Sequence, residues 1–577
     1  MFKNKIKNKQ IRFSIRIGGP AGEGIVSSGQ ILAKVFSRSG FKVLMSGEYY
    51  SLIRGGHNYT TVEVSNQLIY SFKKEVEILI SLDKRTISEH RNFLSSKGLI
   101  VFDPTKINPK EIELTKDKLL AIPFTKLAQE AGGQPVMANM ASLGAALAII
   151  GQPMGELLKL ISEMFSRNGQ AVVDLNQKIA QAGFDFADKP NLRIVSGGQG
   201  TNNKSKQYLL TGNQAAALGA MSAGLKFFAG YPMTPATGIM EFLAEWAEEY
   251  KIVVKHSEDE IAASLMAIGA GFSGARAMTA TSGGGLCLMV ESFGLATMAE
   301  VPLVVVDCQR PGPATGLPTR TSQGDLKLVA YGTVDSAPRI VLSPGDQEET
   351  FYLTKLAFNL AEIYQAPVFI LLDKYLAESQ ASLNDLKFDL IKIDRGQSRV
   401  EPKENYNRFA LTLNSISPRV LPGQDGRTYT AVGNEHNEFG DISEEPKIRN
   451  LMLKKRADKL AKVKISVADI IKPIKIYGPK SAKKAVVFWG SPKGAVLEAI
   501  KDLKDFKAIQ VMQLRPFPKE EFLEAVGGVK RLILVENNFD GQLGDLIREQ
   551  TGVLVNEKIL RYDGRPFQFE EVKLNLL

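Results

Sequence analysis

The stretch FAGYPMTPAT, residues 228–237, sets two prolines three positions apart around a single threonine, Thr234. It follows a β-rich run and precedes the helix-like stretch GIMEFLAEWAEEY. Pro232 and Pro235 fix their own φ angles and favour extended conformations at Tyr231 and Thr234. A loop after a strand lies at the carboxyl edge of a sheet, where α/β proteins bind ligands. A plain loop that ends one helix and starts another is the alternative.

The segment around this loop alternates helical and β-rich runs from about residue 208 to about residue 390. The β-rich runs, among them VPLVVVDC and APVFILLD, are almost entirely apolar, as expected of parallel strands covered on both faces. This pattern predicts a doubly wound α/β domain at 208–392.

Two more α/β domains are predicted, one on each side of the central one. Residues 11–196 form the first, with strands expected at LIYSF, VEILISL and GLIVFD. A linker rich in Gly and Asn is predicted at 197–207, and an extended connector ending in a surface helix at 393–467. The last domain spans 468–577. The predicted fold class is therefore α/β with three α/β domains.

Composition excludes several classes of protein. With 44% hydrophobic and 23% charged residues in 577, the chain has the balance of a globular protein. No apolar run reaches the roughly 20 residues that cross a bilayer, and MANMASLGAALAIIGQPMGELL predicts a buried helix instead. The basic start leads into no apolar signal core and predicts a solvated tail. The presence of only two cysteines fits a reducing environment, so a cytoplasmic location is expected.

The net charge of +10 is spread along the whole chain. A nucleic-acid interface would need clustered Lys and Arg with interleaved aromatic residues, so no nucleic-acid partner is expected. A basic surface of this kind can still steer an acidic protein partner.

The chain has two cysteines, Cys287 and Cys308, and no disulfide framework. Two thiols cannot hold a four-thiolate zinc ion or an iron–sulfur cluster, so no metal site is predicted in this chain. The hydrolase elbow G-x-S-x-G is absent as well. The four histidines are not paired at metal-binding spacing along the sequence: His57, His90, His256 and His436.

The stretch HSEDEIAASLMAIGAG, residues 256–271, places Asp259 and Glu260 in the first turn of an Ala-rich helix. Acidic residues there complement the helix dipole, so capping is their ordinary role. A carboxyl group buried against an apolar helix can also exchange protons near neutral pH. Periodicity alone does not decide which of the two faces inward.

Arg310 comes directly after the strand VPLVVVDC, with Thr315 and Thr319 nearby. A guanidinium group in this position can bind a carboxylate through two parallel hydrogen bonds, and a structural arginine is the alternative. The glycine-rich turn in TATSGGGLCLMVESFG, residues 279–294, is typical of close packing at a domain interface.

The loop GGPAGEG, residues 18–24, allows backbone N–H groups to approach a phosphate ahead of a helix. It matches a dinucleotide fingerprint poorly, because Glu23 lies inside the loop. A tight strand-to-helix turn is the alternative. The helix that follows carries Ile25, Leu32 and Val35 on one side.

Taken in order, these motifs resemble those of the α subunit of 2-oxoacid:ferredoxin oxidoreductases. The resemblance is carried by TGNQAAALGAMSAGLKFFAGYPMTPAT, EDEIAASLMAIGA, TSGGGLCLMVESFGLA, QRPGPATGLPTRTSQGDL, GNEHNEFGDISEEP and VENNFDGQLGDLIREQTG. The N-terminal segment, with GGPAGEG, EYYSLIRGGHNYTTVEVS and FDP, is similar to the γ subunit. The whole chain resembles a γ–α fusion, as in 2-oxoglutarate-oxidising and broad-specificity members.

The resemblance implies a function. These enzymes decarboxylate a 2-oxoacid with thiamine diphosphate, pass two electrons through an iron–sulfur cluster to ferredoxin, and transfer the acyl group to coenzyme A. It implies that 208–392 binds the aminopyrimidine ring and that 468–577 is transketolase C-terminal-like.

The resemblance also assigns roles to residues. Glu260 matches the glutamate that contacts the pyrimidine nitrogen and moves its proton. Thr234 matches the threonine that hydrogen-bonds the substrate, while Arg310 and Thr319 match the residues that hold its carboxylate end. The catalytic residues implied are thus Glu260, Thr234 and Arg310. The cofactor-binding residues implied are Tyr231, Pro232 and Glu260.

The chain departs from the family's complete site in one respect, because it contains no Gly-Asp-Gly. The motif that binds diphosphate and magnesium in thiamine enzymes begins with these residues. A β subunit is therefore expected to supply Mg²⁺, the diphosphate site and the iron–sulfur cluster, with thiamine diphosphate shared at the interface. The expected partners are this β subunit, ferredoxin, a small-molecule 2-oxoacid and coenzyme A. GGPAGEG departs from the usual G-x-G-G-Q-G, so no coenzyme A role is assigned to it.

The preferred reaction is 2-oxoglutarate to succinyl-CoA, with pyruvate or a branched-chain 2-oxoacid as alternatives. The distal carboxylate of 2-oxoglutarate needs a second cation, which Arg320 or a β-subunit residue can supply. A non-catalytic assembly or regulatory subunit on the same fold is the alternative from another class. The missing Gly-Asp-Gly disfavours a self-sufficient thiamine decarboxylase or synthase.

Overall fold

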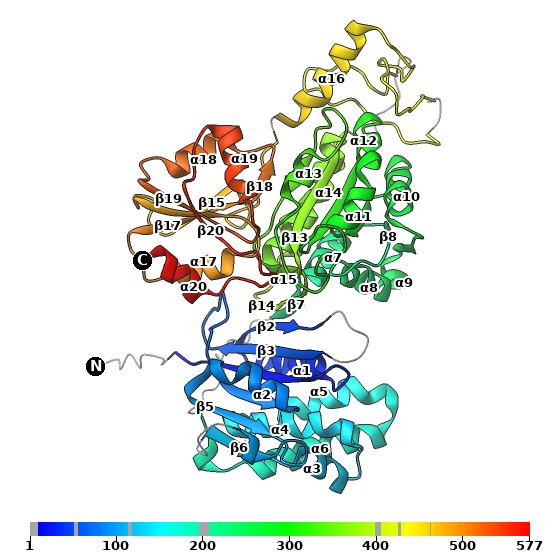
Figure 1. Ribbon diagram of the computed structural model, residues 1–577. Helices are drawn as coiled ribbons and strands as arrows, with labels where there is room; N and C mark the ends of the chain where they lie inside the picture. The colour runs from blue at the N-terminus through cyan, green and yellow to red at the C-terminus, as the bar shows by residue number, and fades with distance from the viewer. Residues whose placement is uncertain are drawn as a thin grey trace, which may run out of the picture. The chain divides into compact units, whose positions relative to one another are not determined.

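The computed structural model describes residues 10–50, 56–112, 118–194, 207–397, 406–424, 428–461 and 463–577. They form two compact units (Figure 1). Unit 1 comprises the described residues up to Leu209 together with Ser379–Asp385, and unit 2 comprises those of Leu210–Glu378 and Leu386–Leu577. Both units combine helices with β-sheets, which confirms the predicted α/β class. Except for Gln207, the linker predicted at 197–207 lies outside the described residues, and the boundaries of the three domains stay predictions.

Unit 1 is built on an eight-stranded sheet with the order β6-β5-β4-β1-β3-β2-β14-β7. Its strands are β1 (Arg12–Pro20), β2 (Lys42–Glu48), β3 (His57–Ser65), β4 (Val76–Ser81), β5 (Leu94–Phe102), β6 (Leu119–Ala121), β7 (Tyr208–Thr211) and β14 (Gln380–Leu383). Its helices are α1 (Ile25–Arg38), α2 (Lys84–His90), α3 (Phe124–Glu130), α4 (Ala138–Ile150), α5 (Gly155–Phe165) and α6 (Gln170–Ala187). Strands β1, β4, β5 and β6 are parallel to one another, whereas β3 pairs antiparallel with β1 and β2, and β14 pairs antiparallel with β2.

The helices of unit 1 follow the apolar pattern of the sequence. Ile25, Leu32 and Val35 are all buried on α1, as predicted. The apolar helix α4 is almost wholly buried against α6, because Gly144 and Gly183 carry no side chain: a Cβ on either would lie about 2 Å from a carbonyl of the facing helix.

In the described part of the chain no single helix is long and apolar enough to cross a membrane. One pair, α3 with the segment 135–150, meets the length and composition criteria together, although a bend of 118° separates the two.

The prediction of a strand at LIYSF, residues 68–72, is wrong. The strand that precedes β4 along the chain is β3, which ends at Ser65. The segment 68–72 is irregular because its polar groups are engaged elsewhere. Ser71 O accepts a hydrogen bond of 2.6 Å from the Arg12 side chain, and nearby Lys73 N donates to the buried Glu63 carboxylate. These side-chain partners replace a ladder with a neighbouring strand.

Unit 2 contains a seven-stranded sheet with the order β18-β12-β13-β11-β10-β8-β9. Its strands are β8 (Phe227–Gly230), β9 (Val253–His256), β10 (Ala277–Thr281), β11 (Leu303–Gln309), β12 (Ile340–Leu342), β13 (Pro367–Asp373) and β18 (Gln513–Arg515). The helices around it are α7 (Gly212–Ser222), α8 (Thr237–Glu245), α9 (Ala247–Tyr250), α10 (Glu260–Phe272), α11 (Gly283–Leu288), α12 (Val290–Met298), α13 (Leu326–Tyr331), α14 (Gln347–Tyr364) and α15 (Lys374–Glu378).

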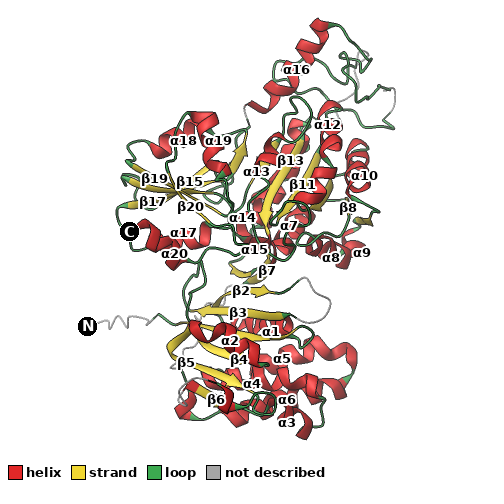
Figure 2. Ribbon diagram, viewed as in Figure 1, coloured by secondary structure: helices red, strands yellow, loops and turns green. Residues whose placement is uncertain are grey.

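The strands β8 to β13 are parallel, and Figure 2 shows helices on both sides of β11 and β13. Both strands are buried at every position, which agrees with the apolar runs of the sequence. The doubly wound prediction for this part of the chain is confirmed.

A second sheet of unit 2 has the order β15-β17-β16-β19-β20. Its strands are β15 (Ile474–Tyr477), β16 (Lys484–Phe488), β17 (Phe506–Val511), β19 (Arg531–Glu536) and β20 (Glu557–Leu560), and its helices are α17 (Lys493–Ile500), α18 (Lys519–Val526), α19 (Gln542–Thr551) and α20 (Phe569–Leu576). Directly after β17 the chain forms β18, which pairs antiparallel with β12. This exchange joins the two sheets of unit 2.

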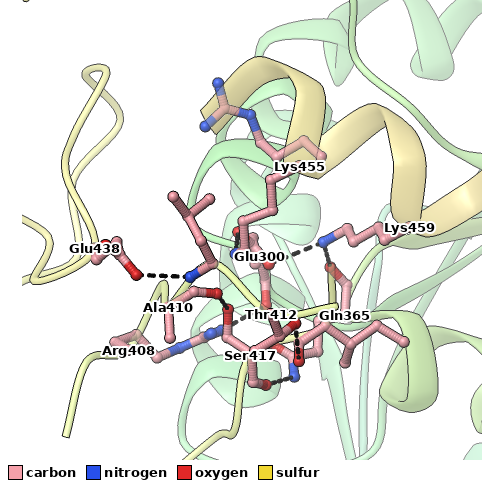
Figure 3. Close-up of polar contacts among 12 residues, drawn as sticks. Glu300, Gln365, Arg408, Ala410, Thr412, Ser417, Glu438, Lys455 and Lys459 are labelled. Atoms are coloured by element: carbon pink, nitrogen blue, oxygen red, sulfur yellow. Dashed lines mark hydrogen bonds and ion pairs between the residues drawn. The ribbon is translucent and has the colours of Figure 1, made fainter. Parts of the chain in front are cut away.

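The connector ends in α16 (Pro446–Ala461), whose prediction as a surface helix is wrong for its second half. Lys455, Arg456 and Lys459 are buried there. The reason is a buried counter-charge: the carboxylate of Glu300, just after α12, pairs with Lys455 and, at 3.0 Å, with Lys459 (Figure 3). A buried cation is tolerated when such a partner is present.

Glu300 is held on all sides. The Arg408 side chain donates to the backbone carbonyl of Glu300 at 2.9 Å. The φ angle of Glu300, 49°, lies in the left-handed region, which a non-glycine residue occupies only when its surroundings enforce it. Burial alone would raise the pKa of the Glu300 carboxyl, but the charges of Lys459, Lys455 and Arg408 outweigh it and hold that pKa well below its usual value.

We expect Glu300→Gln to lower the free energy of unfolding by about 3–5 kcal/mol, because it leaves two buried ammonium groups without their counter-charge. Urea denaturation followed by circular dichroism measures this. Asp458→Asn, which removes an exposed partner of Lys454 on the same helix, is the control and should change stability by less than about 0.5 kcal/mol. Equal effects of the two substitutions would show that Glu300 is not the stabilising counter-charge of Lys455 and Lys459.

The contact of Glu300 with the two lysines also makes the stability of the fold depend on pH. Since the folded-state pKa of Glu300 is depressed, its contribution is complete above the unfolded carboxyl pKa and is lost as the pH falls. The stability difference between wild type and Glu300→Gln should therefore shrink by about 1.4 kcal/mol per pH unit below pH ~4. A difference that stays constant from pH 6 to pH 3 would rule out this charge linkage.

Candidate functional site

The predicted site residues lie on connections that follow neighbouring parallel strands of the central sheet. The loop with Thr234 follows β8, Glu260 begins α10 after β9, the glycines of α11 follow β10, and Arg310 follows β11. In the sheet these strands are adjacent, in the order β11-β10-β8-β9. Their carboxyl ends therefore meet at one edge, which is where open α/β sheets bind ligands.

The Thr234 loop is fixed by contacts as well as by its prolines. Arg310 Nη1 donates to Thr234 O at 2.7 Å, so the structure brings these two residues together. Asn213, in the first turn of α7, donates to Pro235 O at 2.8 Å. On the other side, Thr281 Oγ1 at the end of β10 contacts Met233 Sδ at 3.7 Å. The Thr234 loop is thus held through two backbone carbonyls, those of Thr234 and Pro235, and through the side chain of Met233.

The structure settles which acid of α10 faces inward. Asp259 is the cap, because its carboxylate accepts a hydrogen bond of 2.7 Å from Ala262 N. Glu260 is therefore free of the capping role, and only 3% of it is exposed. Its Oε1 is buried and has no hydrogen-bond partner within the described residues. A buried carboxyl oxygen without a donor is costly unless a bound group completes it.

Two glycines allow carboxyl groups to approach the start of α11. A Cβ on Gly285 would lie 2.6 Å from Glu260 Oε1 and 2.2 Å from Thr281 Oγ1. A Cβ on Gly283 would lie 2.5 Å from Asp325 Oδ2. Close packing at this glycine run is therefore observed, and the groups that pack against it are the carboxyl groups of Glu260 and Asp325.

Three other predicted residues are less closely tied to this centre. Tyr231 and Pro232 are exposed at the rim, with the Tyr231 ring 6.2 Å from the ring of His256. Thr319 is buried on the loop after Arg310, but we find no polar contact between it and Glu260, Thr234 or Arg310 in the part of the chain that the structure describes.

The site contains two acids that the sequence analysis did not single out. Burial lowers the pKa of the Arg310 guanidinium, and the charges of Asp325 and Glu260 oppose this, which places both carboxyl groups near it. Asp325 lies just before α13, and Asp307 lies beside it on β11. The available signal was Asp307 itself, a charged residue inside the apolar run VPLVVVDC.

In unit 1, packing accounts for part of the GGPAGEG loop. A Cβ on Gly18 would lie 2.6 Å from the Thr86 side chain, and Gly24 has a φ of 70° at the start of α1. Glu23 pairs with Lys106 at 3.0 Å. These contacts favour the tight strand-to-helix turn.

Unit 1 also brings together His57 and His90, which are 33 positions apart, so the prediction that the histidines are unpaired holds only along the sequence. With Glu89 they form the single group of three candidate metal ligands found among the described residues. Arg16 Nη1 lies 3.3 Å from His90 Nδ1, and because a guanidinium only donates, this nitrogen must accept. The proton of His90 is then on Nε2 and is donated to His57 Nε2 at 2.8 Å.

This hydrogen-bond chain disfavours a metal ion. Binding through Nε2 of His90 would move its proton to Nδ1, directly against the Arg16 donor. Burial, together with the charges of Arg16 and His57, lowers the pKa of His90 to about 3, which keeps the ring neutral. The two rings therefore form a buried, neutral hydrogen-bonded network that is oriented by the Arg16 donor.

Comparison with known proteins connects these features. Residues 218–454 match the family described as "Pyruvate flavodoxin/ferredoxin oxidoreductase, thiamine diP-bdg", and residues 14–186 match "Pyruvate ferredoxin/flavodoxin oxidoreductase". The 2-oxoacid:ferredoxin oxidoreductase subunit alpha of a Sulfolobus species is 32% identical, over 98% of this chain and 97% of the relative. The chain belongs to this family of 2-oxoacid:ferredoxin oxidoreductase α subunits.

Two other members show how the similarity is distributed. The 2-oxoglutarate synthase subunit KorA of Methanothermobacter thermautotrophicus is 33% identical over 98% of its own length but only 65% of this chain. The 2-oxoglutarate:ferredoxin oxidoreductase of Magnetococcus marinus, solved with 2-oxoglutarate, coenzyme A and succinyl-CoA bound, has a TM-score of 0.91 and 31% identity. It covers 98% of this chain, and 99% of that chain is covered in turn.

The glycine at 285 provides a matched test of the site in this α subunit. We expect Gly285→Ala to lower the 2-oxoacid oxidation rate of the assembled enzyme by about 100-fold, because its Cβ displaces the Glu260 carboxyl. Gly284→Ala is the control, since its Cβ has no neighbour closer than 3.9 Å, and it should stay within about threefold of wild type. Similar rates for both variants would show that the Gly285 contact does not position Glu260.

Proposed function

We propose that this chain is the catalytic, γ–α fused subunit of a 2-oxoacid:ferredoxin oxidoreductase, active with a β subunit. The reaction is the coenzyme A-dependent oxidative decarboxylation of a 2-oxoacid, preferably 2-oxoglutarate to succinyl-CoA, with electrons passed to ferredoxin. One observation carries the proposal: Glu260 Oε1 is buried without a partner in the described chain, at the sheet edge where Arg310 also lies.

The residues of this edge fit the pyrimidine half of thiamine diphosphate. The buried carboxyl of Glu260 suits a ring nitrogen, and glycine at 285 leaves room for that carboxyl beside α11. When bound, thiamine diphosphate supplies the carbon nucleophile that attacks the keto group of the substrate. Glu260 would hold and release the proton at the ring nitrogen.

Arg310 and Thr234 act on the substrate in this proposal. The guanidinium has five N–H groups, of which one is used by Thr234 O, so others are available to a carboxylate in the bidentate geometry that arginine favours. The contact also holds the Thr234 backbone, so the arginine that binds the acid end positions the hydroxyl beside it. Thr319, buried on the same loop, is proposed to complete the carboxylate site.

The surface around Glu260 supports a partner subunit. Ile261 and Leu265, which follow Glu260 on α10, are 44% and 42% exposed, and Leu288 on α11 is 52% exposed. They line an apolar groove of about 600 Å³. Exposed apolar groups of this size next to a buried acid are typical of an interface. Because several relatives are named α subunits, we propose that a β subunit covers this face and brings diphosphate, Mg²⁺ and the iron–sulfur cluster.

The preference for 2-oxoglutarate is supported by two relatives, KorA and the Magnetococcus marinus enzyme with its bound 2-oxoglutarate. Arg320, ten residues after Arg310 and packed against Gly564, is a candidate for the distal carboxylate. Pyruvate or a branched-chain 2-oxoacid is the alternative substrate. We place the enzyme in the cytoplasm.

The proposal is tested by co-expressing the chain with the β subunit encoded beside it and measuring coenzyme A-dependent reduction of methyl viologen with a panel of 2-oxoacids. We expect the highest kcat/KM with 2-oxoglutarate. A stable complex that reduces the dye with none of these acids would favour the non-catalytic alternative, an assembly or regulatory subunit.

Within that assay, Glu260→Gln should lower kcat by about 100- to 10,000-fold, because an amide cannot exchange a proton with the ring nitrogen. Glu258→Gln changes an exposed carboxylate two residues earlier and serves as the control, with activity close to wild type. Near-normal turnover by Glu260→Gln would show that Glu260 is not the proton-carrying residue.

A further inference from the structure

Two carboxyl groups at this sheet edge, those of Asp307 and Asp325, have buried oxygens without a hydrogen-bond donor among the described residues. Asp307 is 0% exposed, and neither of its carboxyl oxygens accepts a hydrogen bond from another described residue. The Oδ2 of Asp325 is likewise buried without a donor. The two carboxyl groups lie within hydrogen-bonding distance of each other.

Two carboxyl groups within hydrogen-bonding distance of each other require a proton between them. Two carboxylates cannot hydrogen-bond to each other, and two like charges in contact, away from water, repel strongly. A single shared proton supplies one O–H donor and leaves one negative charge on the pair. The geometry therefore favours a carboxyl–carboxylate pair at neutral pH.

The charge of this pair faces the arginine of the site. Asp325 and Glu260 both act on the Arg310 guanidinium, and the thiols of Cys287 and Cys308 are further titratable groups close to the aspartates. Asp325 is fixed in place because its backbone N–H donates to Gln309 Oε1 at 3.0 Å.

The access of Asp325 to this position depends on its neighbour in α11. Gly283 allows the contact, since a Cβ there would overlap the Asp325 carboxyl. The arrangement thus uses a specific glycine, a specific amide and two acids to set one charge beside Arg310.

We propose that Asp325 and Asp307 are positioning residues that share one proton and thereby set the charge opposite Arg310, which determines the pH range over which the carboxylate of the oxoacid binds. This inference rests on the proposed role of Arg310 in substrate binding. With one charge on the pair, Arg310 keeps enough positive potential for an anionic substrate. Loss of the shared proton adds a second negative charge and repels it.

The sign of the effect follows from burial. Burial raises the pKa of Asp307 well above that of an exposed carboxyl, and the charge of Asp325 raises it further. The shared proton is therefore lost at a higher pH than the proton of an exposed carboxyl, and the KM for the oxoacid increases on the alkaline side.

The test compares the pH dependence of KM and kcat for the α–β complex of wild type, Asp307→Asn and Asp325→Asn. For wild type we expect KM to rise by up to about tenfold per pH unit above the ionisation of the pair. Either asparagine variant can carry no second charge, so both should lose this rise. A merely structural pair would change thermal stability without changing the pH profile.

Infrared spectroscopy of the full-length chain gives a readout that does not depend on activity. The spectrum of wild type minus that of Asp307→Asn or Asp325→Asn should show a protonated carboxyl C=O band that disappears as the pH rises. The carboxyl groups of Glu63 and Glu536, whose pKa burial raises to about 7, contribute equally to these spectra and cancel in the difference. Glu63→Gln, which changes a buried carboxyl in unit 1 paired with Arg12, is the control and should keep the band of the aspartate pair.

Retention of the KM rise, or of the band, in both asparagine variants would overturn the inference. These outcomes are distinct from failure of the proposed function. An inactive complex that still shows the titrating band would contradict the assigned reaction but leave the shared proton established.

Discussion

The parallel pairing of β8, β9, β10 and β11 is the constraint on which the site depends. Each strand delivers one chemical group at its carboxyl end, namely the Thr234 loop, Glu260, the glycines of α11 and Arg310. None of these groups is near the others along the sequence, and no local contact would gather them. The pairing order alone places a hydroxyl, an acid and a guanidinium within reach of one small molecule, and a change of strand order would separate them.

The chemistry of this edge is set by one arginine and several acids with buried carboxyl oxygens. Asp325 and Glu260 act on Arg310, and Asp307 lies beside Asp325, with which we propose that it shares a proton. The glycines at 283 and 285 make the approach of these acids sterically allowed. The family membership gives the acids their context, because a thiamine enzyme needs one acid that moves a proton and one cation that holds an anion, both away from bulk water.

Local signals in the sequence were sufficient for the elements and for part of the site. Apolar runs identified the parallel strands, and the position of Arg310 after one of them was informative because strand ends converge. Signals were missing wherever two distant side chains decide the outcome. Glu300 and Lys455 are 155 positions apart, so α16 resembled a solvated basic helix. The choice between Asp259 and Glu260 likewise depended on a hydrogen bond to Ala262, which periodicity does not contain. Nor does the spacing of Asp307 and Asp325 reveal that they touch.

The position of β14 shows a consequence of joining both units in one polypeptide. It follows α15 in the second half of the polypeptide, yet it completes the first sheet by pairing with β2. KorA is matched over 98% of its own length but over only 65% of this chain, so this relative lacks a counterpart of the remaining part. Cutting this polypeptide within 195–206 would remove β14 and β7, the last two strands of the eight-stranded sheet, from the amino-terminal fragment. The pairing of β14 with β2 would then be bimolecular and would depend on concentration. In the fused chain β14 is part of the same molecule as β2, so the β2 edge is paired without a diffusional encounter.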